Sequence, residues 1–281
     1  MSEDFFYTIP WRASSPHPGA HASALNGGTD EFAGLVNLMA NPQPRHIDVR
    51  ASIQNPLGQW MVRSFRQRSS IQVQVIADLS GSMSYRGQTE KRETLAQLVA
   101  SIAWSAYREG DRFGFLAAGG ELIESLSLPC RLYKGGAPDL LPRLRAHVCE
   151  GQGMKGLFDA VGRLGRTRSL VFLLSDFHQS QHELAELAMR LTRHDVVPIV
   201  IWDKAEYESL PEYGLVVVED PETGVRRRLL MRPRLREAFA LRFANRKREL
   251  QELFQPLGRS PLFLTEPFKG DILTRYFLMG Q

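Results

Sequence analysis

The chain is poor in cysteine and contains no long apolar run. Its two cysteines, Cys130 and Cys149, are too few for a disulfide framework or a zinc site. We therefore expect both to be free thiols in a reducing compartment. No apolar run reaches the roughly 18 residues that a membrane-spanning helix needs. The opening MSEDFFYTIPW lacks the basic head and apolar stretch of a secretory signal, so we predict a cytoplasmic protein without a membrane span.

Nucleotide-binding signatures are missing or misplaced. No G-x-x-x-x-G-K-[ST] occurs, so any ATPase activity would belong to a partner. The stretch GQGMKG, residues 151–156, fits G-x-G-x-x-G, but a dinucleotide site needs that turn directly after a strand, and the preceding segment is predicted to be helical. No zinc finger or RNP motif accompanies the arginines of residues 226–236, so nucleic acid is not favoured as a partner.

The chain has enough hydrophobic residues for a sizeable core, because they make up 43% of its 281 residues. From about residue 70, buried-strand patterns alternate with amphipathic helix patterns, as in IQVQVIAD, SLVFLLSDF and VVPIVIWD between helical segments. This alternation predicts a doubly wound α/β fold with a mostly parallel sheet. We expect a β-rich N-terminal extension over residues 1–69 and the main domain over residues 70–281, with a β-hairpin insertion at about 212–230.

Two turn motifs predict the structure of the N-terminal extension and of the hairpin insertion. Asn55-Pro56-Leu57-Gly58 predicts a turn between two extended runs within residues 46–65. Residues 220–224, DPETG, predict the turn of the hairpin insertion, and a long helix is expected over about 233–256.

Oxygen-bearing side chains follow two of the predicted strands. Asp78, Ser80 and Ser82 come directly after the strand VIAD, and Asp176 comes after LVFLLS. Because the carboxyl ends of parallel strands meet at one edge of a sheet, we expect these side chains to gather there. Magnesium prefers six oxygen ligands and usually keeps several waters, so a site for a hard cation is one interpretation. Ordinary turn and helix-cap chemistry is the other.

At this point the sequence resembles a known family. DLSGSM is similar to the Asp-x-Ser-x-Ser element of the metal-ion-dependent adhesion site in von Willebrand factor A domains. DEFAGL, RHIDVRAS, DLSGSM, LLSDF, LPEYGLVVVEDPETG and GDILTRYFL occur in the order typical of one bacterial family, domain of unknown function 58. The resemblance covers residues 25–281. It implies a MoxR-type AAA+ ATPase as partner, and the opening segment is similar to that of MxaS-type members of methanol-oxidation gene clusters.

The family pattern also implies a third loop, whose threonine completes the metal site. The corresponding stretch here is GMKGLFDAV, which puts Lys155 at the threonine position. A lysine there could neutralise Asp78 and Asp176 without metal. The sequence therefore leaves open whether Mg²⁺ binds at Asp78, Ser80, Ser82 and Asp176 or whether Lys155 replaces it.

We predict a non-enzymatic, chaperone-like adapter that recognises another protein and acts in maturation of a client, with methanol dehydrogenase as the MxaS-type case. Lys155 and the run Arg226, Arg227 and Arg228 are candidate partner-binding residues. The alternative is a metal-dependent hydrolase or phosphatase at the same strand tips, with His178 and His182 as further metal ligands. Against it, Ser80 stands where a second acid would be needed.

Overall fold

The computed structural model describes residues 4–85, 87, 90–206, 211–219 and 225–279. The chain forms two compact units. The larger unit consists of residues 1–7, 72–108 and 112–281, and the smaller unit of residues 8–71 and 109–111. Both predicted strand tips belong to the larger unit.

The larger unit is built on a six-stranded sheet with the strand order β10-β7-β6-β3-β4-β5. Its strands are β3 (Gln72–Asp78), β4 (Arg112–Ala118), β5 (Leu128–Arg131), β6 (Leu170–Ser175), β7 (Asp195–Ile201) and β10 (Leu262–Leu264). All pairings are parallel except that of β4 with the edge strand β5. β6 and β7 are buried along their whole length, and strands covered on both faces must be apolar throughout.

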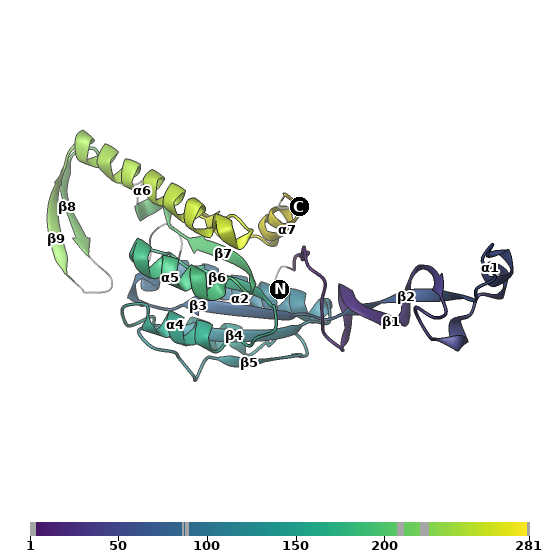
Figure 1. The fold of residues 1–281 in the computed structure, drawn as a ribbon. Helices are drawn as coiled ribbons and strands as arrows, with labels where there is room; N and C mark the ends of the chain where they lie inside the picture. The colour runs from purple at the N-terminus through teal and green to yellow at the C-terminus, as the bar shows by residue number, and fades with distance from the viewer. Residues whose placement is uncertain (1–3, 86, 88–89, 207–210, 220–224, 280–281) are drawn as a thin grey trace. The chain divides into compact units, whose positions relative to one another are not determined.

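Helices cover both faces of this sheet, with α4 and α5 in front and α2 behind it in Figure 1. The helices of this unit are α2 (Lys91–Arg108), α3 (Leu140–Ala146), α4 (Lys155–Gly162), α5 (Gln181–Leu191), α6 (Pro233–Phe254) and α7 (Gly270–Met279). Leu173 of β6 packs in the core formed with α4, α5 and the end of α6, whereas its neighbour Phe172 contacts Phe277 of α7. The predicted doubly wound α/β fold is confirmed. Within the described ranges, none of the helices combines the length and hydropathy that crossing a bilayer requires.

The carboxyl ends of β3 and β6 lie side by side because these strands are neighbours in the sheet, with Ala77 paired to Leu174. The short 3-10 helix η2 (Gly81–Ser84) follows β3, and η3 (Lys204–Glu206) follows β7. Both 3-10 helices therefore leave the same edge of the sheet, as expected for loops after parallel strands.

The predicted hairpin insertion precedes α6. It consists of β8 (Gly214–Glu219) and β9 (Arg226–Met231), paired antiparallel in a continuous register. Its turn, predicted at residues 220–224, lies outside the described residues. After α6, the 3-10 helix η4 (Gln255–Leu257) leads to β10, so the alternation of strand and helix resumes.

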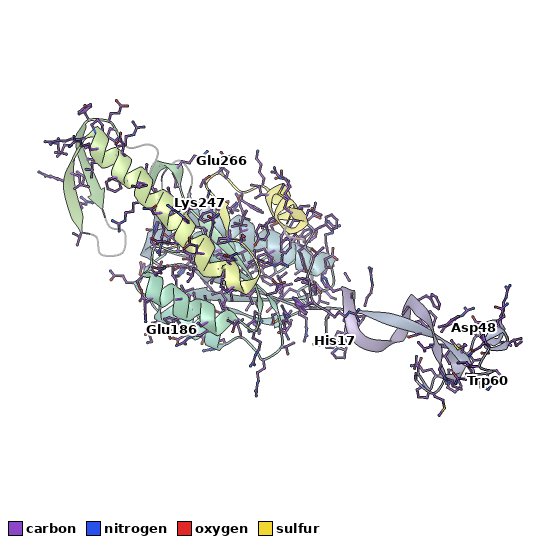
Figure 2. The ribbon with its side chains drawn as sticks, turned by 45° about the horizontal axis from the view of Figure 1, so that its top comes forward. His17, Asp48, Trp60, Glu186, Lys247 and Glu266 are labelled. Atoms are coloured by element: carbon purple, nitrogen blue, oxygen red, sulfur yellow. The ribbon has the colours of Figure 1, made fainter. Side chains whose placement is uncertain are left out.

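The smaller unit is an antiparallel ribbon of β1 (Pro18–Asn37) and β2 (Met61–Ser69). Between them lie the 3-10 helix η1 (Pro44–His46) and the helix α1 (Val49–Gln54). Figure 2 places Asp48 and Trp60 at the α1 end of the ribbon and His17 at the other end. The extended run predicted before the turn at Asn55 is wrong, because residues 49–54 are helical. Asp48 caps this helix by accepting from the backbone N–H of Ala51 at 3.0 Å.

Candidate functional site

The carboxyl end of β3 supplies one carboxylate and two hydroxyls. β3 ends at Asp78, Ser80 precedes η2, and Ser82 lies within it. The backbone N–H of Ser80 donates to Asp78 Oδ1 at 2.9 Å, and the Oγ atoms of Ser80 and Ser82 lie 3.2 Å apart. The exposed fractions are 1% for Asp78, 1% for Ser80 and 6% for Ser82. The three side chains singled out from the sequence therefore lie together in a buried turn.

The carboxyl end of β6 supplies the second carboxylate, that of the fully buried Asp176. Ser175, the last residue of β6, joins the two strand tips. Its Oγ donates to Asp78 Oδ2 at 2.7 Å and accepts from the backbone N–H of Phe177 at 3.0 Å. Phe177 has φ of 51°, a left-handed conformation that is unusual for a bulky residue. Ser175 is not among the residues predicted from the sequence, although it precedes Asp176 directly.

Arg246 of α6 holds the loop that carries Asp176. Its guanidinium donates to the backbone carbonyl of Phe177 at 2.8 Å and also to that of Gln179. The side-chain amide of Gln179 in turn donates to Asp78 Oδ2 at 3.1 Å. The loop after β6 is therefore tied to α6 on one side and to the carboxylate of β3 on the other.

A buried lysine lies against the second carboxylate. Lys91, the first residue of α2, is 1% exposed, and its Nζ lies 3.1 Å from Asp176 Oδ2 and 2.5 Å from Glu206 Oε1. Lys91 is not among the site residues predicted from the sequence. A cation in the first turn of a helix is disfavoured by the helix dipole, but this signal does not single out Lys91, because Lys155 also begins a helix and pairs with an exposed acid.

The charges of this cluster shift one another's pKa values. Burial, followed by repulsion from Asp176, raises the pKa of Asp78. Burial also acts to raise the pKa of Asp176, but the attraction of Lys91 outweighs it and the pKa lies below its usual value. For Lys91, burial acts to lower the pKa, and the charges of Asp176 and Glu206 raise it above normal. The ion pair is therefore charged, while Asp78 holds its proton more firmly than an exposed aspartate.

His178 lies at the rim of the cluster. Its Nε2 is 4.0 Å from Asp176 Oδ2 and 3.7 Å from Glu206 Oε2, and its ring stacks on Trp202. The indole N–H of Trp202 donates to the backbone carbonyl of Asp176 at 2.8 Å. His182, considered with His178 as a metal pair, lies exposed on α5. Across the described part of the chain, no three or more His, Cys, Asp or Glu side chains are grouped to hold a metal.

Lys155 does not supply the cation of the site in the structure. The third loop does lie beside η2, because the backbone N–H of Gly81 donates to the carbonyl of Gly151 at 3.1 Å. However, the Lys155 ammonium lies 2.6 Å from Glu121 Oε1, and both side chains are exposed. The position at which Lys155 was expected, against a strand-tip carboxylate, is occupied by Lys91.

The arginine run lies elsewhere in the larger unit. Arg226, Arg227 and Arg228 are on β9, opposite residues 219, 218 and 217 of β8, and not at the ends of β3 and β6. The side chain of Arg227 is outside the described part of the structure. These residues belong to a surface of the hairpin that is separate from the strand-tip site.

The donor set at the strand tips fits a small hard cation. Asp176 Oδ1 is buried and makes no hydrogen bond with another described residue, and the nearby Ser82 hydroxyl helps to lower the pKa of Asp176. Lys91 compensates the carboxylates of Asp176 and Glu206, while Asp78 and Asp176 repel each other. Hydroxyl and carboxylate oxygens are the ligands that magnesium prefers, so the residues present are compatible with it.

Fold and site together define a class: a doubly wound α/β protein with a buried, oxygen-rich cluster at the carboxyl ends of two adjacent strands. Residues 44–249 match a family model described as "Protein of unknown function DUF58". The chain belongs to this family, and the family assignment made from the sequence is confirmed.

Curated relatives carry no assigned activity in their names. The uncharacterized protein Rv1480 of Mycobacterium tuberculosis is 26% identical over 208 residues, which cover 72% of this chain and 65% of that protein. The present chain thus spans slightly less than two thirds of that relative. A protein of Paracoccus denitrificans, called "Uncharacterized protein in moxR 3'region", is 35% identical over 99 residues, 35% of this chain and 94% of that protein.

Similar solved structures are remote. The conserved hypothetical protein BatB from Bacteroides thetaiotaomicron has 13% identity and a TM-score of 0.47, covering 74% of this chain and 97% of that chain. An aerotolerance-related membrane protein from Bacteroides fragilis has 12% identity and a TM-score of 0.44, covering 74% and 96%. At these TM-scores, neither likeness bears on function.

Proposed function

We propose that this chain is a von Willebrand factor A-like adapter that recognises a protein partner at its strand tips and does not itself catalyse a reaction. Its partner is a MoxR-type AAA+ ATPase, which supplies the ATP hydrolysis, and the pair assembles or matures a client protein. The relative named for its place in the moxR 3′ region supports this pairing. The MxaS-like opening segment extends the proposal to the maturation of a methanol dehydrogenase.

One observation carries the proposal: Asp78, Ser80, Ser82 and Asp176 come together from two neighbouring strand ends. Three of these four residues bear no more than 1% exposed surface, and the cluster holds the buried cation Lys91. Buried charged groups are costly, so a protein keeps them where they are compensated or used in binding. Lys91 is already paired with Asp176 and Glu206, so a divalent cation bound here would supply the positive charge that attracts a partner's carboxylate.

Magnesium is part of this proposal. Ser80 and Ser82 would offer their hydroxyls, and Asp78 and Asp176 their carboxylates. The ion, when bound, would supply a positive centre to which a partner's Asp or Glu can add. In isothermal titration with MgCl₂, we expect binding by the wild type that is lost in Asp78→Ala. No binding by the wild type would contradict this part of the proposal.

Capture of a partner tests the adapter role. A MoxR-type ATPase from the same genome should co-purify with the wild type and be lost, by at least about tenfold, with Asp78→Ala or Ser80→Ala. Lys155→Met is the matched control, because the exposed Lys155 pairs with Glu121 and not with the strand tips. Equal capture by wild type and Asp78→Ala would overturn the proposal. Magnesium-dependent hydrolysis of p-nitrophenyl phosphate by the isolated protein, abolished in Asp78→Asn, would favour the hydrolase instead.

A further inference from the structure

A groove runs along the middle of α6, next to the loop that carries Asp176. Its volume is about 610 Å³, within the range of roughly 300–1,000 Å³ that is usual for binding sites. His178, Gln179 and Ser180 form one wall, and α6 forms the other through residues that include Leu241 and Arg242. The groove therefore begins where the strand-tip site ends.

The helix beside this groove is unusually open. Leu241 is 61% exposed, and only Leu250 and Phe254, near the end of α6, are buried. A second hollow of about 490 Å³ lies along the side of α6 that carries Ala240, Ala244 and Lys247. Figure 2 labels Lys247 on this helix. A surface helix normally buries one apolar stripe, so the apolar side chains in the first half of α6 are available to a partner.

The groove carries two arginines and one acid. Arg242 and Arg246 line it together with Glu249, and the Oε2 atom of Glu249 lies 3.1 Å from Arg246 Nη1, so Arg242 is the cation left to an occupant. In the groove itself, the Arg242 guanidinium makes no ion pair or hydrogen bond with another described residue. Arg246 lies nearby and already bonds to the loop carbonyls. An occupant with apolar and acidic side chains would satisfy both features of the groove.

We propose that this groove binds an acidic amphipathic segment of a partner protein. This inference rests on the proposed function and deepens it, because it names the chemistry of the partner at the strand-tip edge. Apolar side chains of the segment pack on Phe239 and Leu241, and its carboxylates pair with Arg242. This is the mode in which an amphipathic segment lies in a groove through regularly spaced anchors. Nucleic acid would use the arginines but would leave the apolar wall unused.

Occupancy of the groove is linked to the strand-tip site through the loop after β6. Arg246 contacts the groove and donates to the carbonyls of Phe177 and Gln179. Gln179 lines the groove and donates to Asp78. One partner can therefore engage both places at once, with a carboxylate at the strand tips and an acidic segment in the groove. Two linked contacts raise affinity above that of either contact alone.

The probe is a fluorescein-labelled helical peptide with leucine at i, i+3, i+4 and i+7 and glutamate elsewhere. The control peptide carries lysine in place of every glutamate. In fluorescence polarisation, we expect the acidic peptide to bind and the basic one not to bind.

Arg242→Glu and Leu241→Asp should each weaken binding of the acidic peptide by at least about tenfold. Arg166→Glu, at an exposed arginine outside the groove, is the matched control and should bind as the wild type does. Raised salt should weaken binding, since the contact is partly electrostatic.

Ser80→Ala separates this proposal from the adapter function, because the Ser80 hydroxyl lies against Ser82 and Ser80 does not line the groove. It should abolish capture of the ATPase but change peptide affinity by no more than about twofold, since the peptide uses only the groove. Equal binding of the acidic and basic peptides, or no effect of Arg242→Glu, would overturn the groove proposal while leaving the strand-tip proposal intact. Two further results would also overturn it: a self-associated protein that Leu241→Asp converts to monomer in sedimentation, or a DNA oligonucleotide that binds α6 more tightly than the acidic peptide.

Discussion

The ammonium of Lys91 lies 3.1 Å from Asp176 Oδ2, and the two side chains are 1% and 0% exposed. This pair joins the start of α2 to the end of β6, across the edge that carries the strand-tip site. It leaves Asp176 Oδ1 without a hydrogen bond to a described residue. The lysine therefore compensates part of the buried charge and keeps one carboxylate oxygen available.

Removing this lysine should strongly destabilise the fold. Lys91→Met preserves the side-chain length but leaves Asp176 as an uncompensated buried charge, for which we expect a loss of about 3–5 kcal/mol in the free energy of unfolding. The double variant Lys91→Met/Asp176→Asn should recover part of that loss, as measured by urea denaturation. Lys155→Met, at an exposed ion pair, should leave the midpoint nearly unchanged. A double variant less stable than Lys91→Met alone would contradict the pairing.

The raised pKa of Asp78 predicts a particular pH dependence of stability. Because the folded protein binds this proton more tightly than the unfolded chain does, Asp78 makes folding less favourable as pH rises from the ordinary pKa of 3.8 through the higher folded value. The unfolding free energy of the wild type minus that of Asp78→Asn should therefore become smaller or more negative with increasing pH. Urea melts from pH 4 upward measure both free energies, and a wild type that gains stability relative to Asp78→Asn as pH rises would refute the assignment.

The contribution of Asp176 to stability has the opposite pH dependence. Its pKa is lowered in the folded protein, so its contribution to stability is present above its ordinary value and is lost as pH falls through the folded value. In Lys91→Met the pKa of Asp176 should rise, because burial then acts without the compensating ammonium. Carboxyl ¹³C chemical shifts followed by NMR across an acid titration, compared between the wild type and Lys91→Met, would show this change.

Arg246 should position the loop after β6. Arg246→Met removes the donors to the carbonyls of Phe177 and Gln179, and we expect a loss of about 1.5–3 kcal/mol together with faster amide exchange in residues 176–180. Arg246→Lys keeps the charge but not the two-pronged geometry, so it should rescue little. Arg248→Met is the control, since among the residues that the structure describes Arg248 bonds only to Asn245, within α6. Unchanged amide exchange of residues 176–180 in Arg246→Met would show that the loop keeps its conformation without Arg246.

Both cysteines should react slowly in the folded protein. Burial raises the pKa of the Cys149 thiol to about 11, and that of Cys130 likewise to about 11. At pH 8 only about one thiol in a thousand would be a thiolate, the form that attacks a disulfide reagent. Titration with Ellman's reagent should therefore be slow in native protein and rapid after denaturation. Rapid labelling of Cys149 in the folded protein would contradict its burial.

Much of the fold was readable from local patterns. The apolar runs that became β3, β6 and β7 are long, uninterrupted and bounded by polar residues, so they specify buried strands on their own. The run after His46 was misread, because its alternation resembled a strand while the capping carboxylate of Asp48 favours a helix. Short segments are ambiguous in this way, since few side chains distinguish the two periodicities.

By itself, the sequence determined which residues stand at the strand tips, because the ends of β3 and β6 are set by where each apolar run stops. Only the tertiary structure decided which cation meets Asp176. Lys91 lies 85 residues away from Asp176 along the chain, and Lys91 and Lys155 each begin a helix, so the two look equally plausible in one dimension. The packing of α2 against the sheet buries Lys91 at the carboxylates, while Lys155 stays exposed beside Glu121. Burial, which the linear order of residues does not reveal, separates the lysine of the site from a lysine of the surface.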